Sequence, residues 1–152
     1  LSVEPLDLKA ELEDAVYTYR EFFRREGIEL TYQDCPEEAV PISGDPERLR
    51  QVFCNLLDNA MEAAEHIPDS FIDLMVQKKE NTPFVVIVLV NSCRSMPDFD
   101  QNGFPVSHKS GKGRHGFGIK SIRKVVEQYQ GNLRMYYDDT TATFHTIITL
   151  KQ

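Results

Sequence analysis

Residues 45–66, DPERLRQVFCNLLDNAMEAAEH, decide the fold, because they predict a long helix with both a core face and a polar edge. Asp45 suits the N-cap and Pro46 suits the first helical position. Apolar residues then recur at helical spacing, and the helix is expected to stop near His66, before Pro68. The apolar positions are Leu49, Val52, Phe53, Leu56, Leu57, Ala60, Met61 and Ala64.

The polar edge of this predicted helix is the first candidate site. Asn55 and Asn59 are four residues apart and project from one face, and Glu62 and His66 continue the stripe. Amide oxygens that look into a pocket can ligate Mg²⁺, which prefers hard oxygen ligands. The alternative is the wet side of an amphipathic helix. Two asparagines inside a helix are unfavourable by propensity, which favours a function.

Two more helices and five strands are expected around this helix. The first helix runs from its N-cap Asp7 to about Arg25 and ends at Gly27, and another carries Ile119 to Tyr129 and ends at Gly131. Alternating or continuously apolar, β-branched stretches predict strands at residues 28–32, 72–76, 84–90, 133–138 and 142–150. This order predicts a two-layer α/β sandwich, with a mixed, mostly antiparallel sheet and three helices on one face.

Two stretches are interpreted as connections. Residues 35–44 contain proline and glutamate, and residues 91–116 lack periodicity while carrying four glycines and two prolines. An irregular stretch as long as the second is usually functional or mobile.

Residues 109–118, KSGKGRHGFG, form the second candidate site. Glycines let backbone N–H groups approach an anion, and the start of a helix adds free donors and a positive dipole end. The segment lies in an acid-free window, residues 101–126, of a chain whose net charge is −7. A flexible loop without a ligand is the alternative, but the basic window that enters a helix favours phosphate binding.

Composition excludes several classes of protein. A length of 152 residues with 41% hydrophobic content fits one domain with a real core. The acidic net charge argues against bulk nucleic-acid binding. The longest apolar run is too short to span a bilayer, and Leu1 to Ala10 lacks a signal-peptide pattern. The three cysteines, Cys35, Cys54 and Cys93, have no zinc or disulfide spacing and are interpreted as free thiols in a reducing cytosol.

Two motifs resemble those of sensor histidine kinase catalytic domains in the GHKL superfamily. Residues 45–60 resemble the N-box, and residues 116–127 with the later Gly131 resemble the second glycine box. Residues 4–8, EPLDL, resemble the start of such domains, so the resemblance covers nearly the whole chain. It implies a Bergerat-type ATP-binding domain over residues 1–152, with a nucleotide between the N-box helix and a lid.

The resemblance also implies roles for single residues. Asn59 would be the Mg²⁺ ligand, with Asn55 beside it near the phosphates. Hydrolysing relatives carry a glutamate base at the position of Asn55, and an amide cannot take a proton from water. The other residues implied to contact the nucleotide are Glu62, Gly116, Phe117 and Gly118, with Lys109, Lys112, Arg114 and His115 in the lid.

One segment departs from the family pattern. Most of these kinases follow the central strand with Asp-x-Gly-x-Gly, whose aspartate reads the adenine amino group. This chain has Asn91-Ser92-Cys93-Arg94-Ser95 instead, which resembles the degenerate first glycine box of kinases that sense peptide pheromones. Asn91 can still accept a hydrogen bond from adenine, although without the strength of a charged acceptor.

The resemblance implies a function and partners. The domain would bind Mg-ATP in the cytoplasm and donate the γ-phosphate to a histidine on separate dimerisation helices of the same kinase, which in turn serves a response regulator. Contacts with nucleic acid or membrane are not expected. His66, His108, His115 and His145 lack the context of a phosphoacceptor, so the chain alone should not autophosphorylate, and His145 is interpreted as structural.

Two alternatives stay open from the residues. A degenerate or anti-sigma-like module would bind nucleotide only to regulate protein contacts, and the missing adenine aspartate favours it. A hydrolysing ATPase is disfavoured by Asn55.

Overall fold

The computed structural model describes residues 3–33, 39–106 and 114–152, and for residues 114–117 it describes the backbone alone. Each helix is followed by two strands along the chain. Their order is β1 (Glu4–Asp7), α1 (Leu8–Arg25), β2 (Glu29–Gln33), β3 (Pro41–Gly44), α2 (Pro46–Ala64), β4 (Phe71–Lys78), β5 (Phe84–Ser92), α3 (Arg114–Gln128), β6 (Asn132–Asp138) and β7 (Thr143–Lys151).

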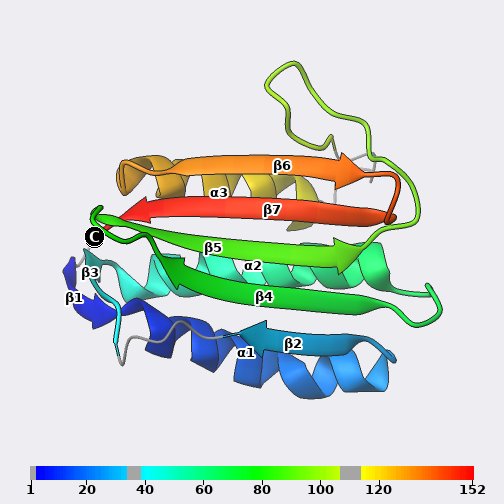
Figure 1. Cartoon of the computed structure of the whole chain (residues 1–152), viewed down its shortest axis with the longest axis horizontal. Helices are drawn as coiled ribbons and strands as arrows, with labels where there is room; N and C mark the ends of the chain where they lie inside the picture. The colour runs from blue at the N-terminus through cyan, green and yellow to red at the C-terminus, as the bar shows by residue number, and fades with distance from the viewer. Residues whose placement is uncertain (1–2, 34–38, 107–113) are drawn as a thin grey trace.

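The main sheet has five strands in the order β2-β4-β5-β7-β6. Strands β2 and β4 run parallel, and the other neighbours run antiparallel. The three helices lie side by side behind one face of this sheet (Figure 1). The predicted two-layer α/β sandwich with a mixed, mostly antiparallel sheet is therefore confirmed.

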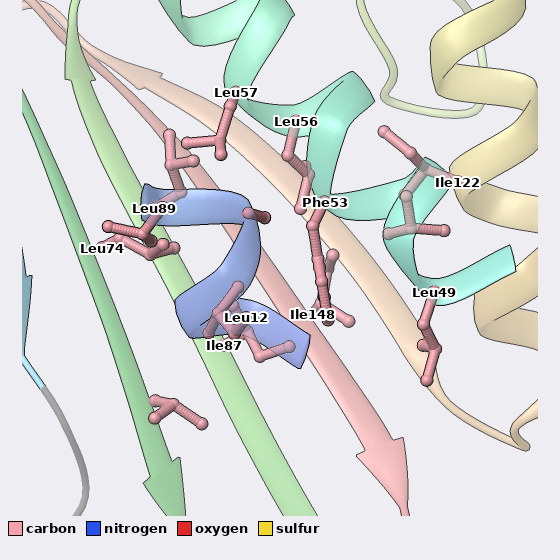
Figure 2. Close-up of a cluster of buried hydrophobic side chains, with 14 of the residues drawn as sticks. Leu12, Leu49, Phe53, Leu56, Leu57, Leu74, Ile87, Leu89, Ile122 and Ile148 are labelled. Carbon is pink, nitrogen blue, oxygen red and sulfur yellow. The ribbon is translucent and has the colours of Figure 1, made fainter. Parts of the chain in front are cut away.

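The core lies between the helices and the sheet. Side chains of α1, α2 and α3 meet the inward side chains of β4, β5 and β7, including Leu12, Phe53, Ile122, Leu74, Leu89 and Ile148 (Figure 2). Successive residues of a strand point to opposite faces, so the alternate residues Val85, Ile87 and Leu89 of the apolar strand β5 belong to the buried core.

The predicted helix starts are confirmed by their caps. Asp7 precedes α1 and accepts a hydrogen bond from the Lys9 amide at 3.1 Å. Asp45 precedes α2 and accepts from the Glu47 amide at 3.0 Å. Asp7 also accepts from the Val40 amide at 2.8 Å, so one carboxylate caps a helix and joins it to the segment before β3.

A second, two-stranded sheet was not predicted. Strands β1 and β3 pair antiparallel, with Glu4 opposite Gly44 and Asp7 opposite Pro41. The prediction that residues 35–44 form a connection was therefore wrong for residues 41–44, which form β3. Cys35 lies outside the described residues. Four-residue strands with two prolines give little periodic signal, because their pairing is decided by a distant segment.

Two helix ends differ from the sequence-based prediction. Helix α2 ends at Ala64, and His66 lies beyond it, exposed and with a φ of 65°, so His66 does not continue the polar stripe. After α3 the left-handed residue is Gln130, with a φ of 54°, rather than Gly131. Gly131 is required for another reason: a Cβ there would overlap the Thr149 carbonyl oxygen. None of the helices within the described ranges has the length and apolarity needed to cross a bilayer.

Candidate functional site

A cavity of about 260 Å³ opens between α2, α3 and the sheet. Helix α2 contributes Leu56, Asn59, Ala60, Glu62 and Ala63 to its lining. The sheet contributes Leu89, Asn91, Met135, Phe144 and Thr146. The lining is mostly apolar with a few polar groups, which is the usual composition of a small-molecule site.

The remaining wall comes from the long connection between β5 and α3. Cys93, Pro97, Pro105 and Val106 line the cavity from this connection, and Ile119 does so from α3. Burial raises the pKa of the Cys93 thiol, which donates to the Ser95 carbonyl oxygen at 3.3 Å. Cys93 is therefore a neutral part of this wall at neutral pH rather than a reactive thiolate.

Three of the predicted site residues meet at this cavity. Asn59 and Glu62 reach it from α2, and Asn91 reaches it from the end of β5. The Asn59 Nδ2 atom is buried and has no hydrogen-bond partner among the described residues. An unpaired buried amide is costly unless a ligand pairs with it, so Asn59 is a group of the cavity lining that a bound ligand would satisfy.

Asn91 is held in one orientation. It is 2% exposed, and its Nδ2 atom donates to the Ser92 carbonyl oxygen at 3.0 Å. In the described part of the chain, this is the one hydrogen bond recorded for its side chain. With the nitrogen used in this way, the amide oxygen is the part of Asn91 that remains to accept a hydrogen bond.

The start of α3 lies against the asparagines of α2. A Cβ built at Gly118 would lie 3.5 Å from Asn59 Nδ2 and 3.7 Å from Asn55 Cβ. Asn55 does not line the cavity itself but lies next to Asn59 under this glycine. The structure thus brings Gly118 against Asn55 and Asn59, which precede it by about 60 residues in the sequence.

The other predicted residues of the glycine-rich segment are described less fully. Lys109 and Lys112 lie outside the described residues, as does His108. Arg114, His115, Gly116 and Phe117 form the first turn of α3, where only the backbone is described. Helix α3 therefore begins at Arg114, whereas the irregular stretch was predicted to continue to residue 116.

Sequence reasoning did not point to several lining residues. Phe144 and Thr146 occupy alternate positions of β7, so the period of two in that strand is a signal that leads to them. Pro97, Pro105 and Val106 come from an irregular segment, and no periodic signal marks them. His145 lies on β7 as expected, bonded to the Thr143 hydroxyl at 2.9 Å and stacked on Tyr136.

Behind the asparagines, α2 is fixed to α1 by a polar contact. The Tyr19 hydroxyl donates to Asp58 Oδ1 at 2.7 Å and lies 3.3 Å from the Cys54 carbonyl oxygen. Burial, followed by the bond to Asp58, raises the pKa of Tyr19 well above its usual value of 10.0. The hydroxyl therefore stays protonated and keeps donating to α2.

Comparison with known proteins points to one family. The family described as the GHKL domain matches residues 46–149. The sensor kinase BarA of Escherichia coli K12 is 28% identical over 145 residues, covering 87% of this chain and 15% of BarA. The kinase SasA of Rippkaea orientalis is 25% identical over 129 residues, covering 80% of this chain and 31% of SasA.

Solved structures show the same fold. The catalytic domain of the histidine kinase ThkA superposes with a TM-score of 0.80 at 18% identity, covering 99% of this chain and 98% of that one. The mycobacterial sensor kinase MprB gives a TM-score of 0.76 at 20% identity, covering 99% and 97%.

The chain belongs to the GHKL domain family. It spans less than a third of the length of the curated relatives BarA and SasA.

Proposed function

We propose that this chain binds Mg-ATP in the cavity beside α2 and donates the γ-phosphate to a histidine on separate dimerisation helices of the same kinase. The observation that carries the proposal is that Asn59, with its unpaired buried amide nitrogen, lines a mostly apolar cavity and lies against Gly118 of α3. This arrangement supports a site in which Asn59 and the start of α3 would face the ion and the phosphates, while the apolar lining would face the base.

The residues present suit a magnesium ion held together with phosphates. The Asn59 amide offers an oxygen to the ion and a nitrogen that donates to a phosphate, with Asn55 as its neighbour. Held by Asn59 and the phosphates, a magnesium ion would supply positive charge to offset the negative charge on the transferred phosphoryl group. Asn55 has no carboxylate with which to activate water, so the site orients a nucleotide without promoting its hydrolysis.

Asn91 is proposed to recognise the adenine amino group. Its nitrogen is used by the Ser92 carbonyl oxygen, so the amide oxygen is the group available to the base. The base would then lie between Asn91 and the wall formed by Pro105 and Val106. Glu62 is proposed to contribute to the nucleotide site from the next turn of α2, and Arg114, His115, Gly116 and Phe117, with Lys109 and Lys112, to contact the phosphates.

The wider assignment follows from the relatives. ShkA, which contains this fold, is known in complex with AMPPNP, and the histidine kinase ThkA is known in complex with the response regulator TrrA. We place this domain, as a single unit over residues 1–152, in the cytoplasmic part of such a kinase, with dimerisation helices and indirectly a response regulator as its partners. The neutral Asn91 supports a second candidate, a module that binds nucleotide to regulate protein contacts.

Calorimetric titration with a non-hydrolysable ATP analogue and Mg²⁺ tests the proposal. Asn59→Ala should weaken binding by about tenfold or more, because a charge-assisted contact is lost. Asn132→Ala, an exposed asparagine at the start of β6, should bind like the native chain. Absence of binding by the native chain at millimolar analogue would overturn the proposal.

Phosphotransfer separates the two candidates. The chain, mixed with the dimerisation helices of its own kinase and labelled ATP, should transfer label to their histidine. Binding of the analogue without any transfer would support the regulatory module instead.

A further inference from the structure

Residues 97–106, the outer wall of the cavity, form a folded turn rather than an irregular loop. The Asp100 carboxylate accepts from the Asn102 and Phe104 amides at 2.8 and 3.1 Å. Backbone bonds join Asp100 to Phe104 at 2.8 Å and Val106 to Asp98 at 2.7 Å. The turn therefore keeps its own shape, and its position on the cavity depends on what anchors it.

Two aromatic contacts anchor this outer wall. Phe99 stacks on Phe144 of β7, with ring centroids 6.2 Å apart and an interplanar angle of 15°. The Arg123 guanidinium lies over the Phe104 ring, 4.2 Å from its centroid. Phe144 lines the cavity itself, so the first contact fixes the wall to the sheet, and the second fixes it to α3.

The Arg123 guanidinium is paired with the aromatic ring of Phe104. Among the described residues its guanidinium makes no ion pair, and the half-buried Phe104 packs against the core. A cation over a partly desolvated ring is attracted more strongly than one in open water. Arg123 also follows Gly118 by five residues on α3, so it links the wall of the apolar slot to the helix that lies against Asn55 and Asn59.

We infer that Arg123 is a positioning residue, which sets nucleotide affinity by holding residues 97–106 against the cavity through the Phe104 ring. The inference rests on the proposed function, because the nucleotide is the ligand whose base this wall would cover. Arg123 acts through Phe104 and does not need to contact the nucleotide. Pro105 and Val106, which directly follow Phe104, are the wall residues whose position it controls.

A double-mutant cycle in nucleotide affinity tests this role. Arg123→Gln and Phe104→Leu should each lower the affinity for the Mg-bound, non-hydrolysable ATP analogue by about three- to tenfold. The double variant should be no weaker than the worse single variant, because both changes remove the same contact. Arg123→Lys keeps a cation over the ring and should recover most of the affinity.

The matched control is Arg134→Gln. Arg134 lies over Tyr136, with 5.1 Å between its guanidinium and the ring, and removing it makes the same charge change on the face of β6 opposite to Met135. It should leave affinity unchanged, and thermal unfolding should show that every variant is folded at the titration temperature. A structural role alone would lower the melting temperature without coupling the two substitutions in affinity.

The outcomes distinguish a failure of the inference about Arg123 from a failure of the proposed function. If Arg123→Gln weakens binding while Phe104→Leu does not, or if the two effects add fully, Arg123 acts independently of Phe104 and the inference is wrong. Native-like affinity of Arg123→Gln also overturns it while the proposed function stands. If the native chain binds no analogue, the proposed function fails and the inference fails with it.

Discussion

The two walls of the cavity are built in different ways. Helix α2 supplies one wall and buries seven residues, from Leu49 to Ala64, in the core (Figure 2). Residues 97–106 supply the opposite wall and are held by a turn around Asp100 and by the rings of Phe99 and Phe104. The first wall is fixed by the packing of the whole fold, and the second by a few local contacts.

Because the two walls are held differently, substitutions in them should affect different properties, either the stability of the fold or the affinity of the cavity for its ligand. A change in α2 that disturbs the core should unfold the protein together with the site. A change in residues 97–106 should alter the cavity while the sandwich stays folded, because few buried apolar groups depend on that segment. Substitutions in and around the two walls test this contrast between stability and affinity.

The largest effect is expected from Phe53→Ala. Phe53 is 1% exposed between α2 and the sheet, so its loss leaves a cavity and should lower the free energy of unfolding by about 3–5 kcal/mol. Urea unfolding measures the change. Phe22→Ala, which removes a ring that is 54% exposed on α1, is the control and should cost far less. Equal losses for the two variants would contradict the core role of α2.

Gly44→Ala should come next. Gly44 directly precedes the N-cap of α2, and a methyl group there would overlap the Tyr129 hydroxyl. We expect a loss of about 1–3 kcal/mol from overpacking, measured by thermal unfolding. The same substitution in a Tyr129→Phe background should cost less, since the nearest overlapping atom is gone. An unchanged melting temperature for Gly44→Ala would show that Tyr129 moves aside freely.

Tyr19→Phe should cost about 1 kcal/mol, because α2 loses the hydroxyl that bonds Asp58. The pKa of Tyr19 is raised in the folded state relative to its value of 10.0 in the unfolded chain. The stabilisation is therefore fully present below pH 10 and is lost as the pH rises above it.

Urea unfolding from neutral pH to above 10 measures this loss. The difference between the native chain and Tyr19→Phe should shrink over that range. Tyr17→Phe, at a tyrosine that is 82% exposed, is the control and should show no such difference. A constant difference across the range would show that Tyr19 does not bring about the pH dependence.

The smallest effect on stability is expected from Asp100→Ala. The turn loses the carboxylate that accepts from Asn102 and Phe104, which should lower global stability by about 1 kcal/mol or less. Affinity for the ATP analogue should still fall, because the wall is no longer held in shape. Asp100→Asn keeps an acceptor and should stay close to the native chain. A large drop in melting temperature would show that the two walls are not independent.

Much of the fold was predictable because it repeats with a local period. The helices that begin after Asp7 and Asp45, the apolar strand β5 and the hairpin of β6 and β7 all follow from spacing and caps within their own segments. Within the site, Asn59 and Glu62 were predictable as neighbours, because residues three or four apart share one face of a helix. Whether that face met a cavity or water was not predictable from the same pattern.

The helices and the polar edge of α2 could be predicted from the sequence, since each depends on contacts within one segment, and the order of helices and strands was enough to predict the sandwich class. Tertiary structure alone decided that β1 pairs with β3, that Gly118 lies against Asn55 and Asn59, and that Asn91 reaches the same cavity as Asn59. It also placed Arg123 over Phe104. These contacts join segments far apart in the chain, and their free energy depends on a register and a distance that no local pattern encodes.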